Sequence, residues 1–326
     1  MPWRPLAVAC LLVLCALAAL QVGSVVRHAA DGDGPRTGAA LAAVPALLAA
    51  PDSAADRTVA AYDGLGAWVD LYDTGGDPVL VTPDVVDDMA DHGVRTLYLQ
   101  VARDQETGDP GLADPSLAAR FLVRAHQRGL RVVGWYVPRF GDIGRDLDHL
   151  QAIDRFEVLG HRFDGVAVDI EWTETVPDPV DRSARLVELS QGLQDSVGGD
   201  AIGAIVLPPV QTDVVNPALW PGFPWGDLAG LYDAWLPMGY WTQRTVASGY
   251  RDAGAYTAEN IDRLRAEVGT GAVVHAIGGL AEDTTADDLA GFARAADTGG
   301  AVGTSLYDWA TLAPETRRLA TDTLGG

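Results

Sequence analysis

The sequence predicts a single (β/α)8 barrel, or TIM barrel, over residues 59–326. Eight short apolar segments, each bounded by Gly, Pro or Asp, recur at a mean spacing of about 34 residues, enough for a strand, a loop and a helix. The segments between them carry helix signals, and no second pattern interrupts the alternation. A doubly wound sheet is the other candidate, but the first strand-to-helix turn lacks a G-x-G-x-x-G sequence. The expected strands begin near Leu65, Val94, Leu130, Asp164, Ile202, Tyr232, Ala272 and Ala301.

The helices expected between these strands have recognisable ends. The expected N-caps are Thr82, Asp114, Thr257 and Thr285. The first two precede a proline, which favours the first helical position, and their helices should end at Gly93 and Gly129. Residues 179–197 have apolar side chains at helical spacing. The proline-rich residues 208–225 should form a loop with at most a short helix.

The N-terminus resembles an export or anchor signal. Residues 6–26 form an uncharged, mostly apolar run of 21 residues, whereas a bilayer span needs about 20 and a secretory core about 7–15. We therefore expect residues 1–28 to be an uncleaved signal anchor, with a cleaved signal peptide as the alternative. Residues 29–58 should form an Ala-, Gly- and Pro-rich linker with one short helix near 41–50. The barrel would then be extracellular or lie at the outer face of the cytoplasmic membrane.

Composition excludes several classes of function. The formal net charge of −22 disfavours nucleic-acid binding and repels anionic lipid, so membrane contact should involve the N-terminal segment only. All 23 basic residues are arginine, which excludes Schiff-base chemistry on a lysine. Both cysteines, Cys10 and Cys15, precede the folded part, and the histidines lack metal-ligand spacing. We therefore expect no metal and no cofactor.

The fourth strand carries the strongest chemical signal. Side chains alternate along a strand, so Ala167, Asp169 and Glu171 should point into the barrel. The two carboxyl groups would then approach the C-terminal mouth, where such barrels have their active sites, about 7 Å apart at the backbone. Burying two acids is costly unless they are hydrogen-bonded or share a proton. Such pairing raises one pKa, which suits a general acid.

This strand resembles a known family signature. Residues 163–171, FDGVAVDIE, are similar to the D-G-x-D-x-D-x-E sequence of chitinase-like enzymes, glycoside hydrolase family 18. Asp164, Gly165, Asp169 and Glu171 match, and Ala167 replaces the middle aspartate. The resemblance implies that Glu171 protonates the glycosidic oxygen and that Asp169 turns the substrate's N-acetyl group toward the anomeric carbon. Related barrel families of glycoside hydrolases carry a similar D-x-E sequence and are an equal alternative.

Two further patches extend the resemblance. Met238-Gly239-Tyr240 is similar to the family's M-x-Y motif at the end of strand six, whose tyrosine steadies the N-acetyl oxygen. Trp309 would correspond to the tryptophan that forms the floor of the sugar site after strand eight. The residue after the motif departs from the family, because Trp241 stands where Asp or Asn is common.

Other polar and aromatic residues are expected at strand ends. Tryptophans there favour a carbohydrate ligand, because aromatic faces stack on sugars; Trp135 could instead pack on helices. Glu282 or Asp308 could serve as a nucleophile if either lay about 5 Å from Glu171. His275 is expected to be a satisfied core or rim histidine. The expected substrate-binding residues are Gln100, Tyr136, Asp164, Trp172, Met238, Asp308 and Trp309.

The sequence thus predicts a glycoside hydrolase that acts on a β-linked polysaccharide, either chitin or a cell-wall glycan. Asp169, Glu171 and Tyr240 are the expected catalytic residues. The alternative is an inactive barrel that binds glycan or a protein partner at the cell surface, which the alanine at position 167 favours. Convergence of the Asp169 and Glu171 carboxyls with the Tyr240 hydroxyl would favour the enzyme.

Overall fold

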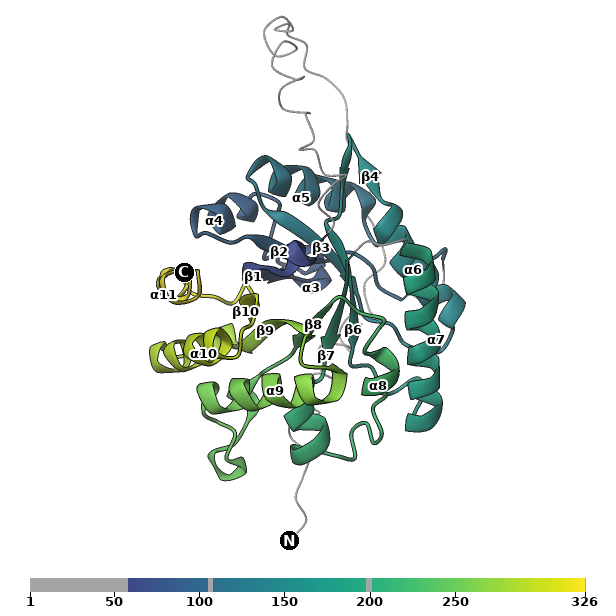
Figure 1. Ribbon diagram of the computed structural model, residues 1–326. Helices are drawn as coiled ribbons and strands as arrows, with labels where there is room; N and C mark the ends of the chain where they lie inside the picture. Colours follow the sequence, from purple (N-terminus) through teal and green to yellow (C-terminus); the bar gives the residue numbers. More distant parts are fainter. Residues whose placement is uncertain (1–57, 105–107, 198–200, 326) are drawn as a thin grey trace, which may run out of the picture. The chain divides into compact units, whose positions relative to one another are not determined.

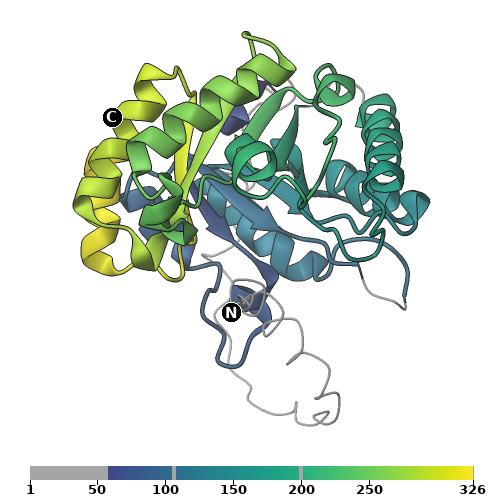
Figure 2. The same cartoon turned by 90° about the horizontal axis from the view of Figure 1, so that it is seen from below.

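The computed structural model describes residues 58–104, 108–197 and 201–325. Eight parallel strands close into a barrel with helices around the outside, as Figures 1 and 2 show from two directions. The predicted TIM barrel is therefore confirmed. The signal or anchor segment, the linker up to residue 57 and its short helix lie outside the described residues. The barrel strands are β1 (Gly64–Val69), β2 (Thr96–Gln100), β3 (Arg131–Tyr136), β6 (Gly165–Ile170), β7 (Ile202–Val206), β8 (Ala234–Pro237), β9 (Val273–Leu280) and β10 (Gly303–Tyr307).

Closure depends on the pairing of the first and last strands. Gly64 of β1 is in register with Gly303 of β10, and on its other side β1 pairs with β2. Because all eight strands are parallel, their C-terminal ends form a single mouth. Each strand begins within two residues of its predicted start.

The helices follow the strands in the predicted alternation. Two predicted caps are confirmed, since the side chains of Asp114 and Thr285 accept the expected amide hydrogen bonds. Two are wrong: the helix after Thr82 begins at Val85, and Thr257 lies inside a helix capped by Asp252. A short π-helix, Val210–Val215, occupies the proline-rich loop. The helices are α3 (Leu71–Gly75), α4 (Val85–Asp91), α5 (Pro115–Gln127), α6 (Ile143–Arg155), α7 (Pro179–Val197), α8 (Trp225–Leu228), α9 (Ala253–Val268), α10 (Ala286–Thr298) and α11 (Pro314–Leu324).

Two apolar cores hold the barrel together. The outer core lies between strands and helices, and the inner core fills the barrel with large rings that include Trp68, Tyr98 and Trp135. Tyr62, from the 3-10 helix Val59–Tyr62, is fully buried, and its hydroxyl donates to the Val166 carbonyl at 3.1 Å. Glycine at position 203 leaves room for it, because a Cβ there would lie 2.7 Å from the tyrosine ring.

His275 lies in this interior, as expected for a core histidine. It is fully buried, and its ring contacts the Tyr62 carbonyl, the Tyr98 hydroxyl and the Ser305 hydroxyl at 2.8, 3.2 and 2.9 Å. Among the described residues, no helix is both long enough and apolar enough to span a bilayer.

Candidate active site at the mouth of the barrel

Strand β6 orients its side chains as the alternation predicts. Val166, Val168 and Ile170 pack in the outer core, whereas Ala167 lies in the inner core. Asp169 is only 7% exposed, and its Oδ1 has no hydrogen-bond partner among the described residues. Glu171 follows at the end of the strand and is half-buried.

Burial perturbs both of these carboxyl groups. It raises the pKa of Asp169 well above its ordinary value, and the negative charge of Glu171 raises it further. Burial likewise raises the pKa of Glu171. Removing a carboxylate from water disfavours its charged form, so the pair retains a proton at a higher pH than free carboxyl groups would. Such a proton is what a general acid must hold.

Tyr240 belongs to the same electrostatic environment. Burial raises its pKa, and the charges of Glu171, Asp169 and Asp308, in that order, raise it further. Tyr240 lies two residues after Met238 in the chain. Met238 is buried in the inner core, and its amide donates to the Val206 carbonyl at 2.9 Å. Because charge effects weaken with distance, strands β6, β8 and β10 bring these acidic groups close to one phenol.

A second tyrosine, which sequence reasoning missed, ends the last strand. The Tyr307 hydroxyl donates to Oδ2 of Asp70 at 2.6 Å. Its ring centroid lies 6.2 Å from that of Tyr240 and 6.3 Å from that of Trp68. Ser305 bonds inside the barrel, so two-residue alternation along β10 also directs Tyr307 inward. That alternation is the signal that could have identified it.

The predicted sugar-site tryptophan lies elsewhere. Trp309 is 4% exposed in the outer core, with the Arg317 guanidinium 5.1 Å above its ring and the His92 ring 5.9 Å away. A ring covered in this way cannot form the floor of a sugar site. After Asp308 the chain has left the strand, and Trp309 turns back toward β1, its amide donating to the Trp68 carbonyl at 3.2 Å. Tyr307 holds the inward position instead.

Three carboxyl groups cluster between β1 and β10. Ligand atoms of Asp70, Asp73 and Asp308 all lie within 4.8 Å of one another. Burial raises the pKa of Asp73 to about 7, and the charges of Asp70 and Asp308 contribute. Burial also raises the pKa of Asp308, whose Oδ1 accepts from the Thr311 amide at 2.9 Å. A retained proton explains this close approach.

These acids are also the group, among the described residues, that could hold a cation. Both oxygens of Asp70 already accept hydrogen bonds: Oδ1 from the amides of Tyr72 and Asp73, and Oδ2 from Tyr307. Asp70 is therefore a poor ligand in this arrangement, because binding a cation would compete with those bonds. Independence from metal stays a prediction.

Besides Trp309, two more predicted substrate-binding residues are not at the mouth. Asp164 precedes β6 at the opposite end of the barrel, where its Oδ2 lies 2.9 Å from His126 Nε2 and accepts from the Val132 amide at 2.7 Å. Tyr136 packs in the outer core, and its hydroxyl donates to Asp146 at 2.6 Å. Asp164 comes before its strand and therefore lies at the N-terminal end of the barrel. Tyr136 lies on the face of β3 that side-chain alternation directs toward the helices.

Other predicted residues do lie at strand ends. Gln100 is buried, and its Oε1 accepts from the Leu71 amide at 3.1 Å, which ties β2 to α3. Trp172 follows Glu171 on the rim, where the Arg139 guanidinium lies 4.6 Å above its ring. Trp135 lies in the inner core, 5.9 Å from Trp68 and edge-on to it, so it does not pack on the helices.

One alternative nucleophile lies just after β9. Glu282 belongs to the 3-10 helix Ala281–Asp283, and its charge raises the pKa of Asp308. Whether Glu282 or Asp308 attacks the sugar stays a prediction.

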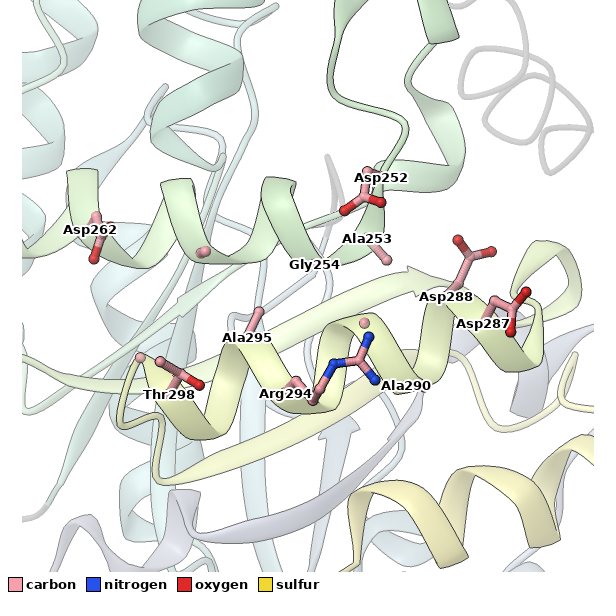
Figure 3. A pocket seen from close by; sticks show the side chains of 13 residues that line it. Asp252, Ala253, Gly254, Asp262, Asp287, Asp288, Ala290, Arg294, Ala295 and Thr298 are labelled. Atoms are coloured by element: carbon pink, nitrogen blue, oxygen red, sulfur yellow. The ribbon is translucent and has the colours of Figure 1, made fainter.

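A separate groove of about 690 Å³ lies outside the barrel, between α9 and α10 (Figure 3). Asp262 projects from α9 and Arg294 from α10, and small side chains line much of the remaining wall. None of the mouth residues lines this groove. It is therefore distinct from the candidate active site.

The fold is similar to that of solved TIM-barrel structures named as chitinases, a mannanase and a spore cortex-lytic enzyme. The spore cortex-lytic enzyme SleL of Bacillus cereus aligns with a TM-score of 0.59 and 10% identity over 80% of this chain and 74% of its own. A class V chitinase mutant from Cycas revoluta, solved with (GlcNAc)3, aligns with a TM-score of 0.58 and 12% identity over 80% and 100%. An endo-1,4-β-D-mannanase from Thermotoga petrophila aligns with a TM-score of 0.54 and 10% identity over 76% and 88%. No protein-family model and no curated sequence matches the chain.

Proposed function

We propose that this protein is a glycoside hydrolase that acts on a β-linked polysaccharide, with N-acetylated glycans such as chitin or cell-wall glycan as the class to test first. The observation that carries the proposal is the pair of buried Asp169 and half-buried Glu171, whose pKa values are both raised and whose charges act on Tyr240. Structural neighbours named as a chitinase, a mannanase and a cortex-lytic enzyme support it at the level of the fold.

Glu171 is the proposed general acid. Its proton passes to the glycosidic oxygen as the bond to the anomeric carbon breaks, and its carboxylate then takes a proton from the attacking water. Asp169 would hold the N-acetyl group so that the acetyl oxygen forms the new bond to that carbon. The Tyr240 hydroxyl would donate to the same oxygen. Tyr307, adjacent to Tyr240, is the aromatic ring proposed to contact the sugar in place of Trp309.

The second candidate is a barrel that binds glycan without cleaving it. Ala167 supports this alternative, because the signature that β6 resembles has a third acid at that position. With alanine at position 167, Glu171 is the acidic residue whose charge raises the pKa of Asp169. A pure binder, however, has no use for one buried and one half-buried acid whose desolvation costs folding free energy.

The test is Glu171→Gln, compared with the wild type on glycans that the wild type cleaves. We expect kcat to fall by about 10²–10⁴-fold with little change in glycan binding, because glutamine has nearly the shape of glutamate but can neither donate the proton nor take one from water. Glu174→Gln is the matched control, since Glu174 is exposed in the same loop. Equal hydrolysis by Glu171→Gln and wild type would refute the mechanism. Binding without cleavage by the wild type would favour the inactive barrel.

We also propose that the N-terminal segment holds the barrel at the outer face of a membrane. The proposal rests on the uncharged run at residues 6–26. Fractionation of expressing cells should recover the full-length chain with the membranes. A shortened soluble form outside the cell would indicate a cleaved signal peptide, and full-length protein in the cytosol would contradict both forms of export.

A further inference from the structure

Arg182 is a buried cation in the first turn of α7. It is 2% exposed, and four hydrogen bonds join its guanidinium to backbone carbonyl oxygens. Nη1 donates to Thr173, Val176 and Pro177 at 3.1, 2.8 and 3.4 Å, and Nη2 donates to Leu219 at 3.3 Å. Burial lowers the pKa of Arg182, and the nearby Asp178 opposes this effect. Removing a guanidinium from water is costly, so these contacts must offset a large penalty.

The plane of the guanidinium is also held in place. It stacks 4.2 Å above the ring of Trp220, which is 1% exposed. Trp220 is anchored in turn, because its Nε1 donates to Ser183 Oγ at 3.0 Å and its ring lies 6.0 Å from that of Phe140. Arginine suits this position, since its planar fork can donate at its edge while its face stacks.

The three converging carbonyls belong to the segment that follows Glu171. Residues 171–178 join the end of β6 to α7 and contain neither helix nor strand. Their carbonyls therefore lack the partners that regular structure would provide, and Arg182 supplies them. The fourth carbonyl, of Leu219, lies in the loop after β7, so one side chain links two neighbouring loops of the mouth.

We propose that Arg182 is a positioning residue that holds the β6–α7 loop closed beside Glu171. The proposal rests on Glu171 being the proposed general acid. Loss of the Arg182 side chain would release the loop and let more water reach the Glu171 carboxyl group. A better-solvated Glu171 would ionise at lower pH and would carry its proton less often near neutrality.

Two measurements that need no substrate test this role in the full-length protein. Arg182→Gln removes the charge and most of the donors, and Arg182→Lys keeps the charge but loses the planar fork. Hydrogen exchange at the amides of residues 172–176 and 178 should speed up about tenfold or more in Arg182→Gln, and less in Arg182→Lys. The Glu171 carboxyl signal, followed by ¹³C NMR and assigned by its absence from Glu171→Gln, should titrate about one pH unit lower in Arg182→Gln.

Arg185→Gln is the matched control on the same helix. Arg185 donates to the carbonyls of Phe140 and Gly141 at 3.0 and 3.2 Å, which belong to the loop after β3. We expect this variant to change neither measurement. Unchanged exchange in both Arg182 variants would overturn the proposal. Faster exchange with an unshifted Glu171 titration would reduce Arg182 to a purely structural role and would also overturn it.

If Arg182→Gln does not fold, the same two measurements on Arg182→Lys decide the question. Wild-type protein that cleaves no glycan would refute the proposed function. Hydrogen exchange in the loop and the NMR titration of Glu171 would still test the role of Arg182. Where a glycan is cleaved, the pH limb of kcat that reports the general acid should move in the same direction as the NMR titration.

Discussion

Protonation of His275 should make the barrel sensitive to mild acid. Burial lowers the pKa of this histidine from 6.5 to about 4 in the folded protein. The hydrogen bonds around His275 suit one neutral tautomer, in which Nδ1–H donates to the Tyr62 carbonyl and Nε2 accepts from the Ser305 hydroxyl. The same hydroxyl accepts from Trp68 Nε1 at 2.8 Å. A proton on Nε2 would make the Ser305 hydroxyl accept from both rings, so the hydroxyl proton would lose its acceptor.

The sign and size of the effect follow from linkage. The unfolded chain binds the proton near pH 6.5 and the folded chain only near pH 4, so stability is unaffected above pH 6.5 and falls below it. At about 1.4 kcal/mol per pH unit, the full effect is roughly 3 kcal/mol, of which about 2 kcal/mol is lost by pH 5. Buried carboxyl groups with raised pKa values act in the opposite direction, so total stability against pH does not isolate His275.

The comparison with His275→Gln isolates it. Urea unfolding of both full-length proteins, followed by tryptophan fluorescence, should show the variant less stable at pH 7, because it loses the buried hydrogen bonds. The difference in unfolding free energy should narrow by about 2 kcal/mol between pH 7 and pH 5, since only the wild type loses stability through His275. A difference that stays constant over this range would refute the reasoning.

Three further outcomes are expected. Asp73→Asn should stabilise the protein above pH 7 and lose this advantage as the pH falls toward 4, because the raised pKa of Asp73, about 7, makes its charged form costly in the folded state. Urea midpoints measured across this pH range would show no such trend if the acid cluster were fully solvated. Gly203→Ala should cost about 1–3 kcal/mol of stability, since its Cβ would lie 2.7 Å from the Tyr62 ring, whereas Gly226→Ala, with nothing within 4 Å, should not. Glycan cleavage or binding should survive dialysis against a chelator; loss that a divalent ion restores would point to Asp70, Asp73 and Asp308 as ligands.

The amino-acid sequence by itself determined the features that depend on local periodicity. Strand starts were predictable within two residues, because apolar runs bounded by Gly, Pro and Asp are local signals. The two faces of β6 followed from alternation alone, which directed Asp169 and Glu171 toward the mouth. The caps at Asp114 and Thr285 were predictable for the same reason, since a cap involves residues only a few positions apart.

Only the tertiary structure decided which distant residues meet. Trp309 and Tyr307 are two residues apart, yet the chain's path after β10 buries the first ring and brings the second beside Tyr240. The acid cluster joins Asp70 to Asp308 only because β10 closes onto β1. Arg182 had no sequence signal, because a guanidinium buried among carbonyls is recognisable only once two loops have folded around it. Contacts of this kind depend on closure of the barrel, which no local pattern encodes.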